Sequence, residues 1–251
     1  MSIIKSKISI SVIAIHYSKN DVLQNFLSNV NFADSIQIIN LTDEQIESTN
    51  KNTNIVNPLE NAIEIAILES LATIKSDWIL FLKTNYILPK ELVNEIQKNV
   101  LTLKYGAFCI EKEFVFCGKK MNYGIIEKGE EFYLFRSINA DLFLKNDSNH
   151  NNLAKNKTQS KLINTAYSDF DNYTKELSIF NKIEIEKLTK KGVQPTIFSL
   201  LFQPFSFFLY HYFIKLGFLD GKAGFILVYL HSFNKLRIQL QIWLNNKKIK
   251  Q

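Results

Sequence analysis

Basic and aromatic side chains are interleaved in the last quarter of the chain, and their chemical use is the easiest to infer. From Lys187 onward there are ten basic residues and one acid, Asp220, giving a net charge of +9, whereas residues 1–186 carry −3. Lysine among Phe, Tyr and Trp suits an anionic membrane surface, where each Lys near the headgroups contributes on the order of 1 kcal/mol. Nucleic acid suits this pattern less well, because the chain has only two arginines and bidentate recognition favours Arg.

The remaining reactive side chains define no familiar cofactor site. Two cysteines, Cys109 and Cys117, are too few for a disulfide framework or a zinc ligand set, so we expect reduced thiols in the cytoplasm. Neither a Gly-rich phosphate loop nor a dinucleotide fingerprint is present. The apolar run after Met1 is short and β-branched and lacks a small-residue cleavage site, which indicates a first strand rather than a signal peptide.

Buried strands alternate with amphipathic helices in the first half of the chain. A length of 251 residues with 46% apolar content suffices for one α/β domain with a smaller appendage. The predicted strands are residues 8–17, 36–39 and 77–82, and the predicted helices are residues 21–30, a helix starting at Asn57-Pro58, and one opening at Pro89. This order predicts a mostly parallel sheet with helices on both faces.

The second half is more mixed. We predict strands over 107–117 and 132–135, a polar loop over 145–161, and an amphipathic helix over 172–191 that Gly192 closes. We therefore divide the chain into an α/β domain over residues 1–168 and a C-terminal helical region over residues 169–251.

Two apolar and aromatic stretches, residues 196–214 and 222–244, fill the C-terminal region. The first is about as long as a membrane-spanning helix. It contains Gln203, Pro204 and His211, which favour a helix lying in the membrane interface over one that crosses it. Packing of both helices on the main domain is the alternative.

Three segments carry a family resemblance. They are residues 8–39 (I-S-I-S-V-I-A-I-H-Y through F-A-D-S-I-Q-I-I), residues 76–82 (S-D-W-I-L-F-L) and residues 212–225 (Y-F-I-K-L-G-F-L-D-G-K-A-G-F). Together they resemble the bacterial family 2 glycosyltransferases that add sugars to the lipopolysaccharide core. The third segment is the most specific match.

The resemblance implies a GT-A-like, nucleotide-sugar-binding α/β sandwich whose chemistry depends on carboxylates. In that family an acid at the end of the second strand holds a uridine-type nucleoside. An Asp-x-Asp motif holds Mg²⁺ or Mn²⁺, which neutralises the leaving diphosphate. A further acid acts as general base on the acceptor hydroxyl.

This chain lacks those charges. Asn40 stands where the nucleoside-binding acid is expected, and Lys83-Thr84-Asn85 replaces the metal motif. An amide still hydrogen-bonds a ribose or a uracil edge, but it cannot act as a base or balance a dication at the same strength. The resemblance therefore predicts Asn40, Lys83 and Asn85 as donor-binding residues around one cleft at the carboxyl edge of the sheet, with no metal cofactor.

The general base is harder to assign. A His-Glu pair of the family falls at His150-Asn151, and a later His falls at Asn164. His150 is the candidate base because imidazole titrates near neutral pH, although a His in an Asn-rich loop is more often simply solvated. Other acids considered, none of them in the family's place, are Asp43, Glu44, Glu111, Glu113, Asp141 and Asp147.

Two interpretations of Lys83 remain open. Its ammonium group can neutralise a leaving diphosphate without any metal. Alternatively, Lys83 is a surface lysine in a decayed or repurposed glycosyltransferase.

The sequence predicts a family 2-like glycosyltransferase, peripheral to the inner membrane at its cytoplasmic face. It would transfer a sugar from a nucleotide-sugar donor to a lipopolysaccharide-core or other lipid-linked glycan acceptor. The alternative is a catalytically inactive pseudo-glycosyltransferase that acts as a membrane-associated binding or scaffold protein.

Overall fold

The structure is a computed structural model that describes residues 8–46, 51–58, 63–102, 104–126, 131–140, 154–167 and 170–247. The chain divides into two compact units. The first comprises residues 1–113 and 129–164, and the second comprises residues 114–128 and 165–251. The predicted division after residue 168 lies close to the point between residues 164 and 165 where the chain passes from the first unit to the second. The second unit also includes residues 114–128.

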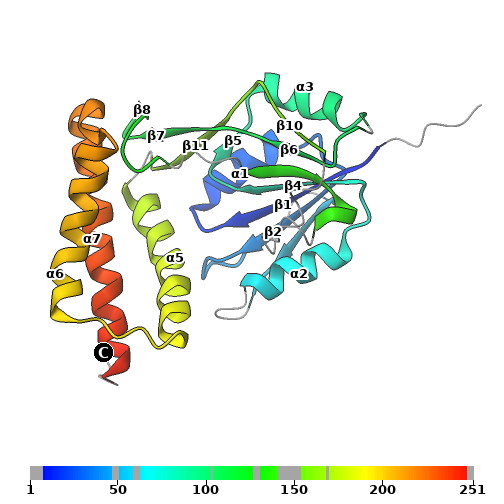
Figure 1. Cartoon of the computed structure of the whole chain (residues 1–251). Helices are drawn as coiled ribbons and strands as arrows, with labels where there is room; N and C mark the ends of the chain where they lie inside the picture. The colour runs from blue at the N-terminus through cyan, green and yellow to red at the C-terminus, as the bar shows by residue number, and fades with distance from the viewer. Residues whose placement is uncertain are drawn as a thin grey trace, which may run out of the picture. The chain divides into compact units, whose positions relative to one another are not determined.

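A seven-stranded sheet in the order β10-β6-β9-β4-β1-β2-β3 forms the centre of the first unit (Figure 1). Its strands are β1 (Ile10–His16), β2 (Ser35–Asn40), β3 (Thr53–Val56), β4 (Trp78–Lys83), β6 (Ala107–Cys109), β9 (Phe132–Arg136) and β10 (Lys155–Lys157). Strand β9 runs antiparallel to both of its neighbours, and the other adjacent pairs are parallel. The predicted α/β class with a mostly parallel sheet is confirmed.

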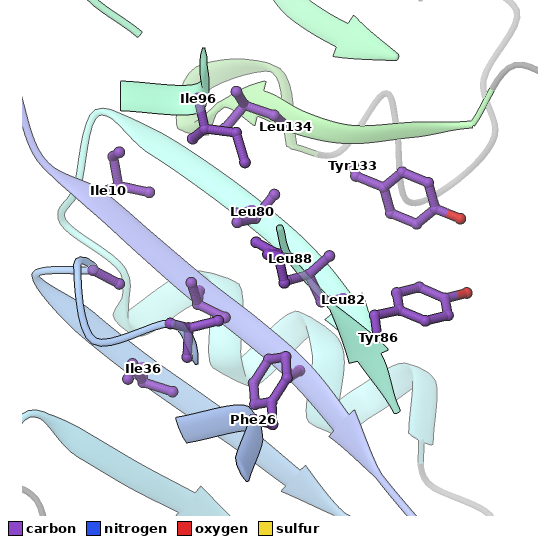
Figure 2. Close-up of a cluster of buried hydrophobic side chains, with 14 of the residues drawn as sticks. Ile10, Phe26, Ile36, Leu80, Leu82, Tyr86, Leu88, Ile96, Tyr133 and Leu134 are labelled. Atoms are coloured by element: carbon purple, nitrogen blue, oxygen red, sulfur yellow. The ribbon is translucent and has the colours of Figure 1, made fainter. Parts of the chain in front are cut away.

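Helices cover both faces of this sheet, as the alternation of strands and helices predicted. They are α1 (Asn20–Asn29), α2 (Ile63–Thr73) and α3 (Lys90–Asn99). Adjacent residues of β1 point to opposite faces: Val12 packs in one cluster with Leu23 of α1 and Leu92 of α3, whereas Ile13 packs in another with Ala66 of α2. Figure 2 shows side chains of the first cluster. Burial on both faces explains why the strand sequence is apolar without alternation.

Several short strands were not predicted. Strand β10 lies inside the segment predicted as a polar loop, where Lys155–Lys157 pairs in parallel with β6. That part of the prediction is wrong, because ladder hydrogen bonds use backbone groups and an edge strand does not need apolar side chains. The predicted strand over 107–117 is two strands, β6 and β7 (Lys112–Phe116), and β3, β5 (Tyr86–Ile87) and β11 (Leu162–Tyr167) had no prediction.

The second unit is mainly helical, as expected for the C-terminal region. Its elements are β8 (Lys119–Met121), α5 (Phe170–Lys190), α6 (Ile197–Leu209), a π-helical turn η3 (Tyr210–Ile214), a short 3-10 helix η4 (Gly217–Asp220) and α7 (Gly221–Asn246). Figure 1 shows α6 and α7 side by side, with α5 on the other side of α7. Asn181 of α5 and Asn234 of α7 exchange two buried hydrogen bonds of 2.6 and 2.9 Å. This reciprocal pair fixes the register of the two helices.

The tail segment that carries the resemblance packs closely around Asp220, and we call it the Asp220 turn. Asp220 Oδ2 accepts hydrogen bonds from the backbone N–H groups of Asn122 (3.0 Å) and Tyr123 (2.9 Å). A Cβ at Gly224 would lie 2.1 Å from the carbonyl oxygen of Gly217, so only glycine fits there. The Asp and Gly residues of this motif therefore hold η4 against the start of α7 and the turn after β8.

Candidate functional site

The carboxyl ends of β1, β2 and β4 meet at one edge of the parallel sheet. In the registers, His16 of β1 pairs with Asn40 of β2, and Ile15 pairs with Lys83 of β4. Since adjacent strands lie about 4.8 Å apart, the backbones of Asn40 and Lys83 are separated by roughly 10 Å. The structure places these residues at the predicted edge, and their role in donor binding stays a prediction, as does the cleft.

Asn40 organises the loop after β2. Its Oδ1 accepts hydrogen bonds from the backbone N–H (3.0 Å) and the hydroxyl (2.7 Å) of Thr42. Its Nδ2 donates to the carbonyl oxygen of Glu44 and to Asn57 Oδ1, both at 2.9 Å. A side-chain amide has two donor hydrogens and two acceptor positions, so this set occupies all four. With 3% of its surface exposed, Asn40 could bind a ligand only by exchanging these bonds.

Asn85 belongs to a buried chain of polar groups. The Tyr17 hydroxyl donates to Asn85 Oδ1 at 2.8 Å, and Asn85 Nδ2 donates to Asn164 Oδ1 at 3.0 Å. Asn164 is the position where the family resemblance implied a histidine. The structure thus brings together two positions 79 residues apart in the sequence, and in this chain both are amides.

His16 and Thr84 form a second buried contact at this edge. Nδ1 of His16 lies 2.9 Å from the Thr84 hydroxyl oxygen, and the Thr84 N–H donates to the carbonyl oxygen of Ile15 at 3.0 Å. Sequence reading treated His16 as the end of a strand and gave Thr84 no role. Because neither residue carries a charge that attracts notice in the sequence, only their spatial pairing identifies them.

Lys83 is the cation of this edge. It is half-buried at the end of β4, and its Nζ lies 6.0 Å from the centroid of the Tyr17 ring. An ammonium group over an aromatic face is stabilised by the ring quadrupole. Tyr17 therefore contacts both Lys83, through its ring, and Asn85, through its hydroxyl.

Glu131 is the acid that sequence reading missed. Glu131 directly precedes β9, the antiparallel neighbour of β4, and lies close enough to Lys83 for the two charges to interact. Glu131 accepts hydrogen bonds from Lys112 Nζ at 2.6 Å and from the Tyr133 hydroxyl. Burial raises the pKa of Glu131, but these two hydrogen bonds and the charges of Lys112 and Lys83 outweigh burial and hold that pKa below its ordinary value. Glu131 is therefore ionised near neutral pH.

Two tyrosines lie beside this acid. The rings of Tyr86 and Tyr133 meet edge to face with centroids 5.9 Å apart. Figure 2 shows both at the margin of the apolar cluster, with their hydroxyl groups pointing away from Leu82 and Leu88. Burial raises the pKa of Tyr133, and Tyr86 and Glu131 raise it further, so the Tyr133 hydroxyl stays a protonated donor to Glu131.

Among the other candidate residues, Asp43 and Glu44 are exposed in the loop after β2, and Glu113 is half-buried in β7. Glu111 forms ion pairs with Lys157 and Lys161, and their hydrogen bonds lower its pKa to about 2, which explains Glu111 as a structural anion. The candidate base His150, with Asn151, Asp141 and Asp147, lies outside the described residues.

The described residues at this edge do not fit a divalent metal. Lys83, Thr84 and Asn85 supply no carboxylate, and the described part of the chain has no group of three or more His, Cys, Asp or Glu side chains able to hold a metal ion. Mg²⁺ and Mn²⁺ prefer charged oxygen ligands, and an ammonium group in their place repels them.

Comparisons with known proteins add a distant likeness of fold. No family model and no curated protein matches the chain. Among solved structures, residues 1–349 of S. aureus TarS have a TM-score of 0.43 at 10% identity, covering 97% of this chain and 92% of that one; a structure of the same piece in complex with UDP gives the same values. The bifunctional IspDF of Campylobacter jejuni has a TM-score of 0.43 at 11% identity, covering 62% and 50%. A likeness at this level carries no argument about function, and the fold class rests on the strand order and registers above.

Proposed function

We propose that the first unit binds a nucleotide-sugar donor at the carboxyl edge of its sheet and transfers the sugar to an acceptor without a metal ion. One observation carries this proposal. The half-buried ammonium of Lys83 ends β4 at the position of the family's metal motif, beside the neutral residues Thr84 and Asn85. Positive charge at the carboxyl edge of a parallel sheet lies where open α/β sheets bind their ligands.

The neighbours of Lys83 explain why a lysine works there without a metal. A lysine between two aspartates would be consumed in ion pairs. Here the flanking positions are amides and hydroxyls that hydrogen-bond one another, and Tyr17 supports the lysine with its ring. Lys83 and Glu131 interact electrostatically, and a diphosphate bound at this edge would add negative charge beside the lysine.

Glu131 is the group best suited to accept the acceptor's proton in this scheme. It is ionised, lies within electrostatic range of Lys83, and is oriented by Lys112 and Tyr133. Its lowered pKa makes Glu131 a weaker base than an ordinary glutamate, but its ionised carboxylate is able to accept a proton from a hydroxyl. Glu131→Gln keeps the size and the acceptor oxygen while removing the charge, so we expect turnover to fall at least about 100-fold, the lower range of general-base effects, with donor binding retained. Equal turnover in both proteins would exclude Glu131 as the base.

The acceptor in this proposal is a lipopolysaccharide-core or other lipid-linked glycan at the cytoplasmic face of the inner membrane. The support comes from the sequence resemblance and from the basic, aromatic C-terminal region, with its net charge of +9. A uridine nucleotide is the first donor to test, because the position of Asn40 corresponds to the uridine-binding acid of that family.

A second function is favoured by a specific observation. All four hydrogen-bonding positions of Asn40 are occupied within the protein, and Asn85 is tied at both ends of its amide. A ligand could use these amides only by replacing hydrogen bonds that the protein already makes, which favours a protein that has kept the fold without the reaction. The second candidate is therefore a pseudo-glycosyltransferase that acts as a binding or scaffold protein.

Titration calorimetry of the full chain distinguishes the two functions. We expect UDP and UDP-sugars to bind in the presence of EDTA, with no gain in affinity from Mn²⁺. Slow release of UDP from a bound UDP-sugar would support transfer, since water can replace the acceptor. Failure of every nucleoside diphosphate and nucleotide sugar to bind would contradict the transferase and favour the scaffold.

The double variant Lys83→Asp with Asn85→Asp serves as the matched test of the metal motif. If it binds UDP only with Mn²⁺ while the wild type binds no UDP at all, Lys83 marks a decayed metal site. If the wild type binds UDP in EDTA and the double variant loses that binding, the lysine is the working cation.

A further inference from the structure

Helices α6 and α7 of the second unit expose a continuous apolar surface. Of the 25 large hydrophobic side chains exposed among the described residues, 18 lie between residues 197 and 243. On α6 and η3 they are Ile197, Phe198, Leu201, Phe202, Phe205, Leu209, Tyr210, Phe213 and Ile214, and on α7 they include Phe225, Tyr229, Phe233, Leu240 and Trp243. Monomeric soluble proteins rarely leave so large an apolar area in contact with water. This set of side chains, here named the α6–α7 face, must therefore have a partner.

The apolar residues of α6 form a stripe rather than a collar. At 100° per residue, positions 197, 198, 201, 202, 205 and 209 fall within roughly 140° of the helix circumference. Phe198, Phe202 and Phe205 are 66%, 51% and 59% exposed, and the first two rings stack with centroids 4.0 Å apart. Ser206 lies beside the stripe, Gln203 lies on the opposite side of the helix, and both are exposed. An amphipathic arrangement of this kind suits a helix that lies in an interface.

Aromatic contacts next to the stripe hold α6 on α7. Phe208 meets Phe225 edge to face at 5.8 Å, and Tyr212 of η3 meets the same ring at 5.7 Å. Residues 197–214 are the one segment in the described part of the chain that is long and apolar enough to cross a membrane. Crossing would separate α6 from these aromatic contacts and put Gln203 into hydrocarbon, so the packing favours lying over spanning.

Exposed lysines flank residues 197–214 on both sides in the sequence. Lys187 and Lys191 precede α6, and Lys215 and Lys222 follow η3. The described acids nearest these lysines in the sequence have partners: Glu184 pairs with Lys235, Glu186 pairs with Lys190, and Asp220 is buried in backbone hydrogen bonds. The flanking charge is therefore positive, which is complementary to anionic lipid headgroups and repels a second copy of the same surface.

We propose that the α6–α7 face binds an anionic lipid bilayer with α6 lying in the plane of the membrane. The phenylalanine stripe enters the boundary between headgroups and acyl chains, and the flanking lysines contact the headgroups. This inference rests on the surface of the second unit alone and is independent of the proposed sugar transfer.

The test is sedimentation of the full chain with vesicles, in the absence of any nucleotide. We expect binding to vesicles of phosphatidylcholine with phosphatidylglycerol and at least tenfold weaker binding to pure phosphatidylcholine. Phe198→Gln with Phe202→Gln and Phe205→Gln should reduce binding at least tenfold. The matched control, Ile65→Gln with Leu101→Gln and Ile138→Gln, alters three equally exposed apolar residues of the first unit and should bind as the wild type does.

Three outcomes would overturn the proposal. Equal binding of the two triple variants would show that the stripe is not the contact. A stable dimer in sedimentation equilibrium that ignores vesicles would assign the face to a second copy of the chain. Protein that stays in the vesicles in 1 M salt and resists protease on both sides of residues 197–214 would indicate a spanning helix. Circular dichroism of both variants checks that the helices remain folded.

Discussion

Polar side chains usually face solvent and apolar side chains are usually buried, and each of the two units departs from one half of this rule. At the carboxyl edge of the sheet, polar groups turn inward and satisfy one another, as in the Tyr17–Asn85–Asn164 chain. On α6 and α7, aromatic side chains face outward. The helices of this unit are held together by the buried Asn181–Asn234 pair and by the Asp220 turn. We propose a diphosphate ligand for the edge of the sheet and a membrane surface for the helices.

A substitution in the Asp220 turn of the second unit should have the largest effect on stability. Gly224→Ala puts a methyl group 2.1 Å from the Gly217 carbonyl oxygen. The methyl group is fixed to the backbone of α7 and the oxygen belongs to the backbone of η4, so neither can move aside without shifting its helix. We expect a loss of about 3 kcal/mol or more in the free energy of unfolding, measured by urea denaturation with circular dichroism. Gly118→Ala is the control, because its φ of +73° costs about 1–2 kcal/mol and nothing lies within 4 Å of the new atom. Equal losses of unfolding free energy in the two variants would show that the Asp220 turn tolerates a side chain at position 224.

A buried histidine makes the second unit sensitive to acid. Burial lowers the pKa of His231 to about 4, and the charges of Lys235 and His211 act in the same direction; Tyr173 packs edge to face on its ring. The unfolded chain, with an ordinary value near 6.5, binds the proton more readily as pH falls, so stability is present at pH 7 and is lost between about pH 6.5 and pH 4.

His231→Asn isolates this contribution. Between pH 7 and pH 5 we expect the wild type to lose about 2 kcal/mol more than the variant in urea denaturation. If both lose the same amount, another group causes the acid sensitivity. The first unit's β-sheet signal should not follow the His231 difference.

The polar chain of the first unit should be needed for stability, whereas its lysine should not. Asn85→Ala leaves the Tyr17 hydroxyl and Asn164 Oδ1 without the partner they share, and we expect a cost of about 1–3 kcal/mol. Lys83→Ala removes a half-buried cation and should cost less than about 1 kcal/mol. Urea denaturation of the two variants measures the difference. A larger loss for Lys83→Ala would mean that the lysine has a structural role, which would weaken the proposed function.

Strong local signals account for the part of the fold that sequence predicts. The apolar runs of β1, β2 and β4 and the proline before α3 locate the core elements, and the parallel arrangement then places Asn40 and Lys83 at one edge. Strands such as β10, with the sequence Lys-Asn-Lys, form only through pairing with a distant strand. No local pattern encodes that pairing.

The site shows the same limit more sharply. Asn85 and Asn164 meet across 79 residues, and Glu131 comes near Lys83 because β9 pairs with β4. The family resemblance identified positions where charge is missing. It could not show that amides at those positions bond one another, nor that an acid enters from another strand.

Binding of UDP to Lys83→Ala in EDTA tests the central claim most directly. Lys98→Ala, on α3, is the control for loss of one positive charge. The account predicts that wild type and Lys98→Ala bind UDP alike without metal, and that Lys83→Ala binds about 10- to 150-fold more weakly, corresponding to about 1.5–3 kcal/mol for a hydrogen bond to a charged group. Equal affinity of Lys83→Ala and wild type, or binding by the wild type only with Mn²⁺, would contradict the metal-free site.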